Sequence, residues 1–318
     1  MKITFLGTSS GAPSRTRNVS AIGLQLVQQG KLWLFDCGEG TQHQVLRSPL
    51  RLSQLERIFI THLHGDHLYG LPGLLASRSL SAGASTPVTI YGPNGLNEFL
   101  RVVFERSQTR PGYPIRVETL HPGTVCEDDQ FEVVCAPMAH RIESYGFAVL
   151  EKTQPGHFDI EQATALGIPP GPIYGQLKRG ETVVLPDGRA IDGNTLVGPP
   201  VEGRKVVYAG DTGETPRAVE LARGADLLIH EATYMSEDAE LAVRGAHSTA
   251  ALAARVAEQA GVKTLVLTHI SPRYDTEGGS RLPELLAEAQ AIFPNTYLAR
   301  DFWTFDVPRR GADAKGLV

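Results

Sequence analysis

Four side chains of types that commonly bind metal ions fall within six consecutive residues, at His62, His64, Asp66 and His67. Imidazole and carboxylate ligands together suit zinc, a metal of borderline hardness. A structural zinc site is usually closed and rich in cysteine, whereas a His/Asp set leaves positions open for water. The cluster therefore predicts a hydrolytic metal site. The alternative interpretation is a histidine-rich polar loop that binds no metal.

Three more residues of these types, His140, Asp211 and His269, are far apart in the sequence but have similar settings. Each comes shortly after, or at the end of, an apolar β-branched run typical of a buried strand. Taken singly, each could be an ordinary polar residue at a strand end. Their shared placement predicts that the ends of several strands bring them to the histidine cluster.

Seven ligands are enough for two metal ions. We expect the first ion to bind three histidines, His62, His64 and His140. We expect the second ion to bind one carboxylate and two histidines, Asp66, His67 and His269. Asp211 is the natural bridge, because the two oxygens of a carboxylate can span ions about 3.5–4 Å apart.

The elements that must position these ligands follow a repeated pattern of strands that end in polar residues and lead into helices. Residues 57–61 read as a buried strand that runs into the cluster, and residues 68–80 have helical spacing. In the second half, strands are expected at 205–211, 226–231 and 264–269. The other expected elements are strands at 3–6, 21–27, 31–35, 88–93 and 131–135, and helices at 95–106 and 248–261. This pattern predicts an α/β architecture in four layers, helix–sheet–sheet–helix.

Residues 152–203 break the pattern, because 16 of these 52 residues are Gly or Pro. Such a density does not suit core elements and indicates an insertion. A long surface loop is one interpretation. However, residues 168–175 are stiff and apolar, and the runs around Pro186-Asp187-Gly188 suggest a small hairpin. We therefore predict a protruding, partly ordered arm inserted in a single domain of residues 1–318.

Composition sets limits on partners and compartment. The formal net charge of −5 argues against binding polyanions through overall charge, although it allows a local basic surface. The three cysteines are odd in number and have no metal-type spacing, which favours free thiols in a reducing cytoplasm. The first residues do not read as a signal peptide, and no apolar run approaches the ~20 residues of a membrane helix. We expect a soluble, cytoplasmic protein with no membrane partner.

The cluster with its distant His, Asp and His resembles the metallo-β-lactamase superfamily, and within it the chain resembles the ribonuclease Z family. The likeness runs nearly end to end, and the segments that carry it are residues 5–8, 13–18, 35–41, 61–75, 209–212, 230–234, 247–249 and 269–271. The resemblance implies a four-layer αββα metallo-β-lactamase fold in which residues 152–203 are a substrate-binding exosite.

The resemblance also implies an activity: a zinc-dependent endoribonuclease with two Zn²⁺ per subunit. Its substrate would be precursor tRNA, cut so that the tRNA keeps a 3′ hydroxyl and the removed trailer keeps a 5′ phosphate. It implies a homodimer in which the arm of one subunit grips the tRNA elbow and serves the active site of the other.

Two residues are candidates for proton transfer, and a third would orient one of them. Asp66 can accept a proton from the attacking water while it stays close to a metal. His247 is the candidate general acid for the leaving 3′ oxygen, and Glu231 is the carboxylate that the family places beside it. At a helix N-terminus the dipole would lower the pKa of His247, so the histidine needs that partner. The alternative is that His247 is a helix residue with no catalytic role.

Asp36 has two interpretations, as an acceptor for a hydrogen bond from a ligand histidine or as a simple turn residue.

The candidates for RNA contact lie in two segments. Residues 13–18 resemble a family loop at the acceptor end, and its candidates are Arg15, Arg17 and Asn18. The family usually has Lys where this chain has Arg15, and a solvated basic turn is the alternative interpretation. In the arm, the family's Gly-Pro motif matches Gly171 and Pro172, with Lys178 and Arg179 downstream. The arm holds four basic and six acidic residues, so any RNA contact must use a few placed cations and backbone amides.

Two other functions remain open at this level. One is an enzyme of the same fold that hydrolyses a small molecule, such as an aryl sulfate, a phosphodiester or a thioester. The other is a non-catalytic RNA-binding relative that has lost its metals. The arm, the loop that carries Arg15 and Arg17, and the 247–249 motif argue against the first. The complete set of seven ligands argues against the second.

Overall fold

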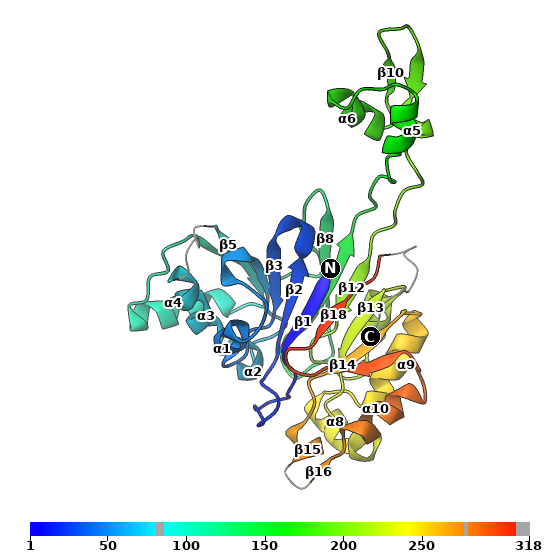
Figure 1. Cartoon of the computed structure of the whole chain (residues 1–318). Coiled ribbons are helices and arrows are strands. Elements are labelled where there is room, and N and C mark those ends of the chain that lie inside the picture. The colour runs from blue at the N-terminus through cyan, green and yellow to red at the C-terminus, as the bar shows by residue number, and fades with distance from the viewer. Residues whose placement is uncertain (81–85, 277–278, 310–318) are drawn as a thin grey trace. The chain divides into compact units, whose positions relative to one another are not determined.

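The computed structural model describes residues 1–80, 86–276 and 279–309 (Figure 1). The chain divides into two compact units. The first comprises Met1–Glu127, Glu132–Leu150 and Lys205–Val307, and the second is built mainly from Asp128–Phe131 and Glu151–Arg204. The second unit thus covers nearly the same residues as the insertion predicted at 152–203.

The first unit contains two seven-stranded sheets, and the N-terminal half of the chain forms most of one of them. Its strand order is β18-β1-β2-β3-β4-β5-β6. The bounds are β1 Lys2–Gly7, β2 Ala21–Leu26, β3 Lys31–Phe35, β4 Leu55–Phe59, β5 Val88–Gly92, β6 Ile115–Thr119 and β18 Thr304–Asp306. Strands β3, β4, β5 and β6 run parallel to one another, so the chain leaves β3, β4 and β5 at the same edge of the sheet.

The other sheet has the order β17-β14-β13-β12-β9-β8-β7. The bounds are β7 Gly123–Glu127, β8 Phe131–Pro137, β9 Tyr145–Glu151, β12 Lys205–Tyr208, β13 Leu227–Glu231, β14 Leu265–Thr268 and β17 Thr296–Leu298. Strands β12, β13, β14 and β17 are parallel. Because parallel strands share a carboxyl edge, the residues that follow β12, β13 and β14 leave the sheet at one place.

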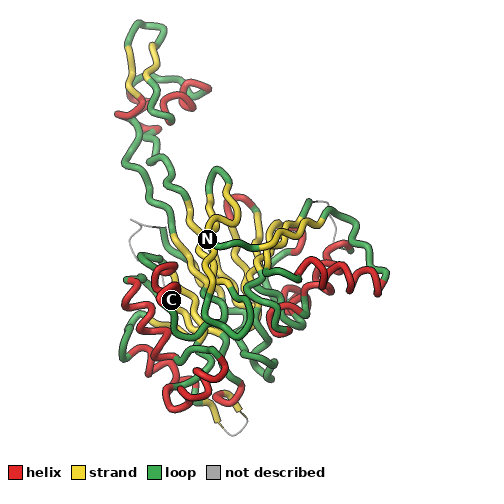
Figure 2. The backbone as a smooth tube through the Cα atoms, turned by 180° about the vertical axis from the view of Figure 1, so that it is seen from behind, coloured by secondary structure: helices red, strands yellow, loops and turns green. Residues whose placement is uncertain are grey.

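Helices cover the outer face of each sheet (Figures 1 and 2). The first sheet carries α1 Thr41–Leu46, α2 Gly65–Leu68, α3 Leu71–Ser79 and α4 Leu96–Ser107. The second carries α7 Pro216–Ala222, α8 Ala239–Gly245, α9 Ala250–Ala260 and α10 Leu282–Gln290. Between the sheets lie aromatic rings from both, with Phe147 5.8 Å from Phe35 and 5.4 Å from Phe59 between centroids. The four-layer prediction is confirmed.

The remaining short elements of the first unit link these layers. They are the 3₁₀ turns Val27–Gln29, Leu52–Gln54, Ser236–Asp238 and Pro272–Tyr274, and the strand pair β15 Asp275–Thr276 and β16 Gly279–Ser280. Within the described parts of the chain, no helix combines the length and the apolar character that a membrane span requires.

Two of the expected elements differ from the structure for reasons that bear on the site. The helix expected at 68–80 is α3, which begins only at Leu71, and the separate short helix α2 ends at Leu68. The chain turns between them at Tyr69 and Gly70, and the Gly70 N–H donates to the carbonyl of Cys37 at 3.0 Å. The strand expected at 205–211 ends at Tyr208. Gly210 follows with φ 63°, a left-handed conformation that ends the strand and frees Asp211 from its ladder.

The second unit has a small core of its own. Helices α5 Ile160–Ala165 and α6 Pro172–Lys178 pack with the hairpin β10 Thr182–Val184 and β11 Ala190–Asp192. The buried side chains are Phe158, Ala163, Ile168, Tyr174, Leu177, Leu185 and Leu196. The hairpin is confirmed at the predicted place, whereas the two helices were not predicted, because six or seven residues show too little periodicity.

We predict that Leu177→Ala loosens the second unit and leaves the first intact. Leu177 is fully buried in the small core, and truncating such a leucine costs about 2–5 kcal/mol of unfolding free energy. Amide hydrogen exchange should accelerate within residues 158–197 and stay unchanged in β12, β13 and β14. Val184→Ala, at a side chain that is 67% exposed, is the matched control. Equal protection in both variants would show that the unit has no cooperative core.

Candidate metal centre

The cluster predicted from the sequence lies just past β4, where the chain turns into α2. Residues 60–64 belong to no helix or strand, and α2 begins at Gly65 with His64 as its N-cap residue in an extended conformation, at φ −64° and ψ 149°. This segment carries His62 and His64 two residues apart. The first helical turn then places Asp66 and His67 beside them. A strand end followed at once by a helix start thus presents four ligand side chains to one region.

The first of the two expected ligand groups comes together around His64. Its Nδ1 lies 3.0 Å from Nε2 of His62 and 3.2 Å from Nε2 of His140. His140 reaches this place from the loop between β8 and β9. The ligand atoms of the three residues all lie within 4.8 Å of one another, close enough to bind one ion.

The second expected group is also assembled. Nε2 of His67 and Nε2 of His269 are 3.2 Å apart, and Asp66 Oδ2 is 3.3 Å from His269 Nε2 and 3.5 Å from His67 Nε2. His269 follows β14 directly and has φ 56°, an uncommon conformation for a residue with a side chain. Backbone strain of this kind is frequent at functional sites, and here it turns the imidazole toward its partners.

Asp211 lies between the two groups, as a bridge would. Its Oδ2 is 3.7 Å from Nε2 of His62, 3.4 Å from Nε2 of His67 and 3.3 Å from Nε2 of His269. Its Oδ1 is buried and has no hydrogen-bond partner among the described residues. A buried carboxylate oxygen without a donor is costly unless a cation neutralises it. The donor set and this oxygen therefore fit a divalent metal.

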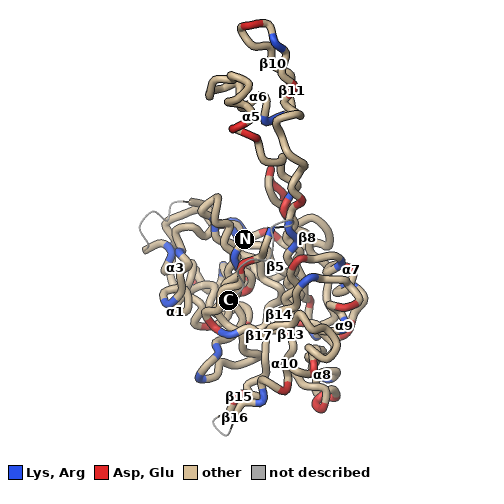
Figure 3. The backbone as a smooth tube through the Cα atoms, turned by 45° about the vertical axis from the view of Figure 1, so that its right-hand side comes forward, with Lys and Arg blue, Asp and Glu red and all other residues tan. Residues whose placement is uncertain are grey.

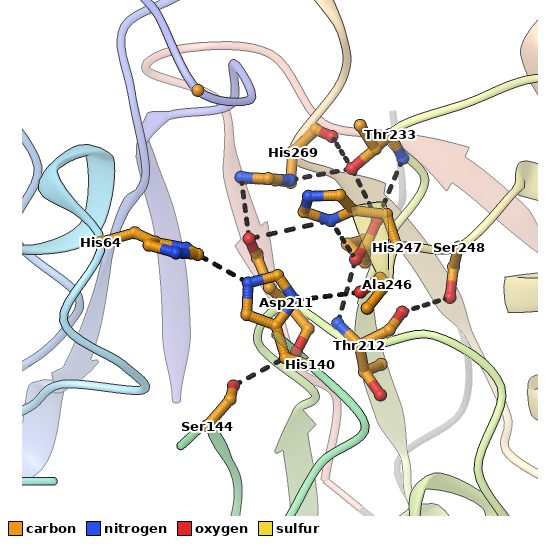
Figure 4. A network of polar contacts seen from close by, with 12 residues as sticks. His64, His140, Ser144, Asp211, Thr212, Thr233, Ala246, His247, Ser248 and His269 are labelled. Atoms are coloured by element: carbon orange, nitrogen blue, oxygen red, sulfur yellow. Dashed lines mark hydrogen bonds and ion pairs between the residues drawn. The ribbon is translucent and has the colours of Figure 1, made fainter. Parts of the chain in front are cut away.

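A hydrogen bond at the opposite ring nitrogen fixes the tautomer of four of the histidines. Nδ1–H of His62 donates to Thr61 Oγ1 at 2.9 Å, and Nδ1–H of His140 donates to the carbonyl of Ala246 at 2.9 Å. Nδ1–H of His67 donates to Asp36 Oδ2, and Nδ1–H of His269 donates to Thr233 Oγ1. In each case Nε2 faces the centre, the arrangement found around metal-binding histidines. Figure 4 shows His140 and His269 in these contacts.

The charge states of the ligands also suit a metal. Burial lowers the pKa values of His62, His64 and His140 and keeps these rings neutral. Burial raises the pKa of Asp66. Hydrogen bonds from His269 and His67 have the larger combined effect, so the pKa lies well below its usual value. Neutral imidazole and ionised carboxylate are the forms that bind metals.

His67 differs from the other ligand histidines. Burial lowers its pKa, but the charges of Asp211 and Asp36 raise it well above the ordinary value. The surroundings thus favour a positive charge at this ring, which a bound dication would supply.

Asp36 is the buried acceptor that holds His67. The Nδ1–H of His67 donates to Asp36 Oδ2 at 2.7 Å, and the hydroxyl of Tyr208 donates to the same oxygen at 2.8 Å. The N–H of Thr61 donates to Oδ1 at 2.8 Å, which ties the carboxylate to the segment before His62. Of the two interpretations of Asp36, the hydrogen-bond acceptor is confirmed and the simple turn residue is not.

His247 and Glu231 form a pair at the edge of the centre. Nδ1–H of His247 donates to Glu231 Oε1 at 2.8 Å. The buried carboxylate also accepts from the Thr212 N–H at 2.9 Å and the Thr233 hydroxyl at 2.6 Å. Nδ1–H of His269 donates in turn to Thr233 Oγ1 at 2.9 Å, so Glu231 also orients a ligand histidine.

The expected effect of a helix dipole on His247 is outweighed. The helix that follows, α9, begins at Ala250 with its N-cap at Thr249, so His247 lies before the first turn. Burial lowers the pKa of His247, but the charge and hydrogen bond of Glu231, together with Asp211, raise it to about 9. The imidazole is therefore protonated at neutral pH in this environment.

Comparison with known proteins identifies the fold and the family. The family model described as "Anti-Pycsar protein Apyc1" matches residues 1–152, and the model "Beta-lactamase superfamily domain" matches residues 188–270. Ribonuclease Z of Trichodesmium erythraeum (strain IMS101) is 57% identical over 97% of this chain and 96% of its own length. Ribonuclease Z of Brevibacillus brevis (strain 47 / JCM 6285 / NBRC 100599) is 54% identical over 99% of both chains.

Comparison with solved structures identifies the same family. The short form of human tRNase Z is 32% identical to this chain, with a TM-score of 0.70. The match covers 97% of this chain and 100% of the human chain. The chain belongs to the ribonuclease Z family. A metallo-β-lactamase fold protein from Bacillus subtilis, at 18% identity and a TM-score of 0.66, shares the fold alone. Membership of the ribonuclease Z family favours RNA over the small-molecule substrates that the sequence left open.

Only part of the loop that was expected to contact RNA is exposed in this family member. Arg17 was predicted to bind substrate, but it is 7% exposed, and its Nη1 donates to Thr8 Oγ1 and the carbonyl of Ala299, both at 2.7 Å. Because its guanidinium is bound by groups of the protein itself, the prediction that Arg17 contacts RNA was wrong. Arg17 instead anchors the loop. Arg15 is exposed. Asn18 is half-buried, and its side chain donates to the carbonyl of Glu39 at 2.8 Å.

The four candidates in the second unit lie at the two ends of one helix. Gly171 is the N-cap residue of α6 and Pro172 its first residue. Lys178 is the last residue, with its ammonium 5.6 Å from the centroid of the Phe158 ring. Arg179 follows and pairs with Glu181 at 2.7 Å, an exposed ion pair that a phosphate could replace at little cost.

We predict that Asp36→Asn weakens metal binding by about 10–100-fold while the protein stays folded. The amide keeps the volume of the side chain but cannot hold the charge that orients His67. Competition with a chromophoric chelator would measure the affinity. Glu39→Gln, on the same loop with an exposed side chain, is the matched control. Equal affinities for the two variants would show that Asp36 does not support the metal.

Proposed function

We propose that this ribonuclease Z family member is the zinc-dependent endoribonuclease that removes the 3′ trailer from precursor tRNA. Family membership makes the chain a hydrolytic endoribonuclease of the metallo-β-lactamase fold. The observation that carries the proposal is the placement of Asp211 between two ligand groups, with the His247–Glu231 pair beside it. Hydrolysis leaves a 3′ hydroxyl on the tRNA and a 5′ phosphate on the trailer.

The metal part of the proposal is two Zn²⁺ per subunit. His62, His64 and His140 would hold one ion, Asp66, His67 and His269 the other, and Asp211 would bridge them. When bound, the ions lower the pKa of a water molecule and neutralise charge on the phosphodiester. The all-nitrogen and oxygen donor set, with no cysteine, supports zinc in an open site.

Asp66 is the proposed proton acceptor. Its carboxylate is ionised, and Oδ2 accepts a hydrogen bond from the Gly11 N–H at 2.8 Å as well as lying beside His67 and His269. This fixes one oxygen in place. The carboxylate takes the proton of the attacking water as the new oxygen–phosphorus bond forms.

His247 supplies the other proton. The bond between phosphorus and the 3′ oxygen of the tRNA breaks, and the oxygen needs a proton as its charge develops. The imidazolium of His247 can donate from Nε2, because Nδ1–H is held by Glu231 at 2.8 Å. Its pKa of about 9 supports the charged form at neutral pH. Glu231 positions the ring and does not itself transfer a proton.

RNA binding, assembly and location complete the proposal. Arg15 and Asn18 would contact the acceptor end, and the arm of residues 152–203 would bind tRNA through Gly171, Pro172, Lys178 and Arg179. Its acids outnumber its bases, and Figure 3 shows both kinds along the second unit, so we assign it a few contacts and no basic surface. The family supports a homodimer. Among the described residues Cys37, Cys126 and Cys135 form no disulfide, which supports a cytoplasmic location.

Cleavage of defined RNA tests the function. Purified protein of known zinc content should cut a 3′-extended precursor tRNA at the end of the acceptor stem and give a 3′ hydroxyl and a 5′ phosphate. Parallel substrates with and without an encoded CCA would show how these nucleotides are treated. An absence of cleavage by zinc-loaded protein would refute the proposal. Hydrolysis of an aryl phosphodiester alone would not support it, because a dinuclear zinc site acts on both.

We predict that His247→Ala lowers kcat about 10²–10⁴-fold on precursor tRNA while zinc content and fold are retained. The substitution removes the proton donor but none of the seven proposed ligands. Single-turnover cleavage measures the rate, and elemental analysis measures the zinc. His43→Ala, at an exposed histidine of α1, serves as control. Near-normal turnover in His247→Ala would remove this residue from the mechanism.

A further inference from the structure

A cavity of about 550 Å³ opens next to the metal centre and is not used by the mechanism above. It lies among α8, α9 and the loops that carry Ala139–His140 and Gly213–Glu214. His140 and His247 form its inner wall, with ring centroids 5.0 Å apart. The volume falls in the range of about 300–1,000 Å³ that is typical of small-ligand sites.

The other walls of the cavity are mostly apolar. Ala242 and Val243 of α8 and Leu252 of α9 line it, and Val243 is 82% exposed, unusual for a large aliphatic side chain. Glu214 and Arg255 are the charged residues of the lining, and both are exposed. Apolar walls beside an imidazole, with charged groups that reach solvent, suit a flat aromatic base that has polar edges.

The segment between α8 and α9 joins this cavity to the catalytic residues. Ala246 has φ 54°, a left-handed conformation, and its carbonyl accepts the hydrogen bond from Nδ1–H of His140. His247 follows at once, and Figure 4 shows Ala246 and His247 beside His140. One short turn therefore orients a ligand histidine, presents the proton donor and lines the cavity. A group in the cavity is therefore next to His247.

The direction of cleavage decides which nucleotide this can be. His247 protonates the 3′ oxygen that leaves with the tRNA, so the ribose carrying that oxygen must lie against His247. The water attacks opposite this oxygen, and the phosphate stays on the trailer through its 5′ oxygen. The nucleotide next to His247 is therefore the one that carries the leaving 3′ oxygen. Single-stranded ends of RNA can turn their bases out of the stack into a protein pocket.

We propose that the cavity binds the base of the nucleotide on the 5′ side of the cut, the last nucleotide kept in the tRNA. Val243, Ala242 and Leu252 pack on the base, and Glu214 and Arg255 are placed to contact its edge. This inference rests on the proposed function, because it takes RNA as the substrate and His247 as the proton donor. It assigns α8 and α9 to positioning the scissile bond.

Removal of one base tests the proposal. Three precursor tRNAs would be compared with wild-type protein: unmodified, abasic at the nucleotide 5′ of the cut, and abasic at the nucleotide 3′ of it. We expect kcat/KM to fall about tenfold with the 5′ abasic substrate, in line with the loss of one stacked base. The 3′ abasic substrate should be cut within about twofold of the unmodified one. A loss confined to the 3′ substrate, or equal rates with all three, would overturn the inference.

A variant links the effect to the cavity. Val243→Trp fills it, so the unmodified substrate should lose about tenfold in kcat/KM, and the 5′ abasic substrate should then be cut as fast as the unmodified one. Glu240→Trp, on the same helix but outside the lining, should keep the wild-type preference for the base. If both variants keep that preference, the base binds elsewhere. Failure of wild-type protein to cut any precursor tRNA would instead refute the proposed function.

Discussion

The structure depends on the neutralisation of one buried carboxylate. Asp211 has one oxygen within 3.7 Å of His62, His67 and His269 and another with no hydrogen-bond partner among the described residues. Burial raises the pKa of Asp211, but the contacts with His269 and His67 lower it well below its usual value, so the carboxylate is ionised. A buried ion of this kind is stable only with compensating charge. The compensating charge comes from residues at the strand ends of both sheets, which are formed by distant parts of the chain.

Two further buried carboxylates, Asp36 and Glu231, organise the histidines around Asp211. Asp36 receives donors from His67, Tyr208 and Thr61, and so connects β3, β4 and β12. Glu231 receives donors from His247, Thr212 and Thr233, and so connects the segments that carry them. Each carboxylate serves both packing and chemistry: it satisfies buried donors and it fixes which ring nitrogen faces the centre. The proposed catalysis depends on this arrangement more than on any single ligand.

The sequence predicts the parts of the site that follow from local patterns. The spacing of His62 to His67, and the appearance of His140, Asp211 and His269 after apolar runs, were sufficient to place all seven residues together, because parallel strands share a carboxyl edge. Contacts between distant segments were not predictable in this way. Arg17 looks like a surface cation in its loop, yet Thr8 and Ala299 bind it inside the protein.

Backbone conformation was the other part that local patterns missed. Asp36, Ala246 and His269 adopt positive φ angles of 58°, 54° and 56°, which their side-chain types do not predict. The roles of Thr233 and the Ala246 carbonyl follow from these turns. Thr233 lies in a segment that resembles the family, but a threonine has no spacing that indicates a bond to a histidine 36 residues away. Such contacts depend on the complete fold.

The bridging role of Asp211 is the central claim, and anomalous X-ray diffraction at the zinc edge tests it most directly. Crystals of zinc-loaded protein should show two anomalous peaks about 3.5–4 Å apart. Each peak should lie about 2.0–2.2 Å from an oxygen of Asp211. A single peak, or two peaks that Asp211 does not contact, would contradict the account.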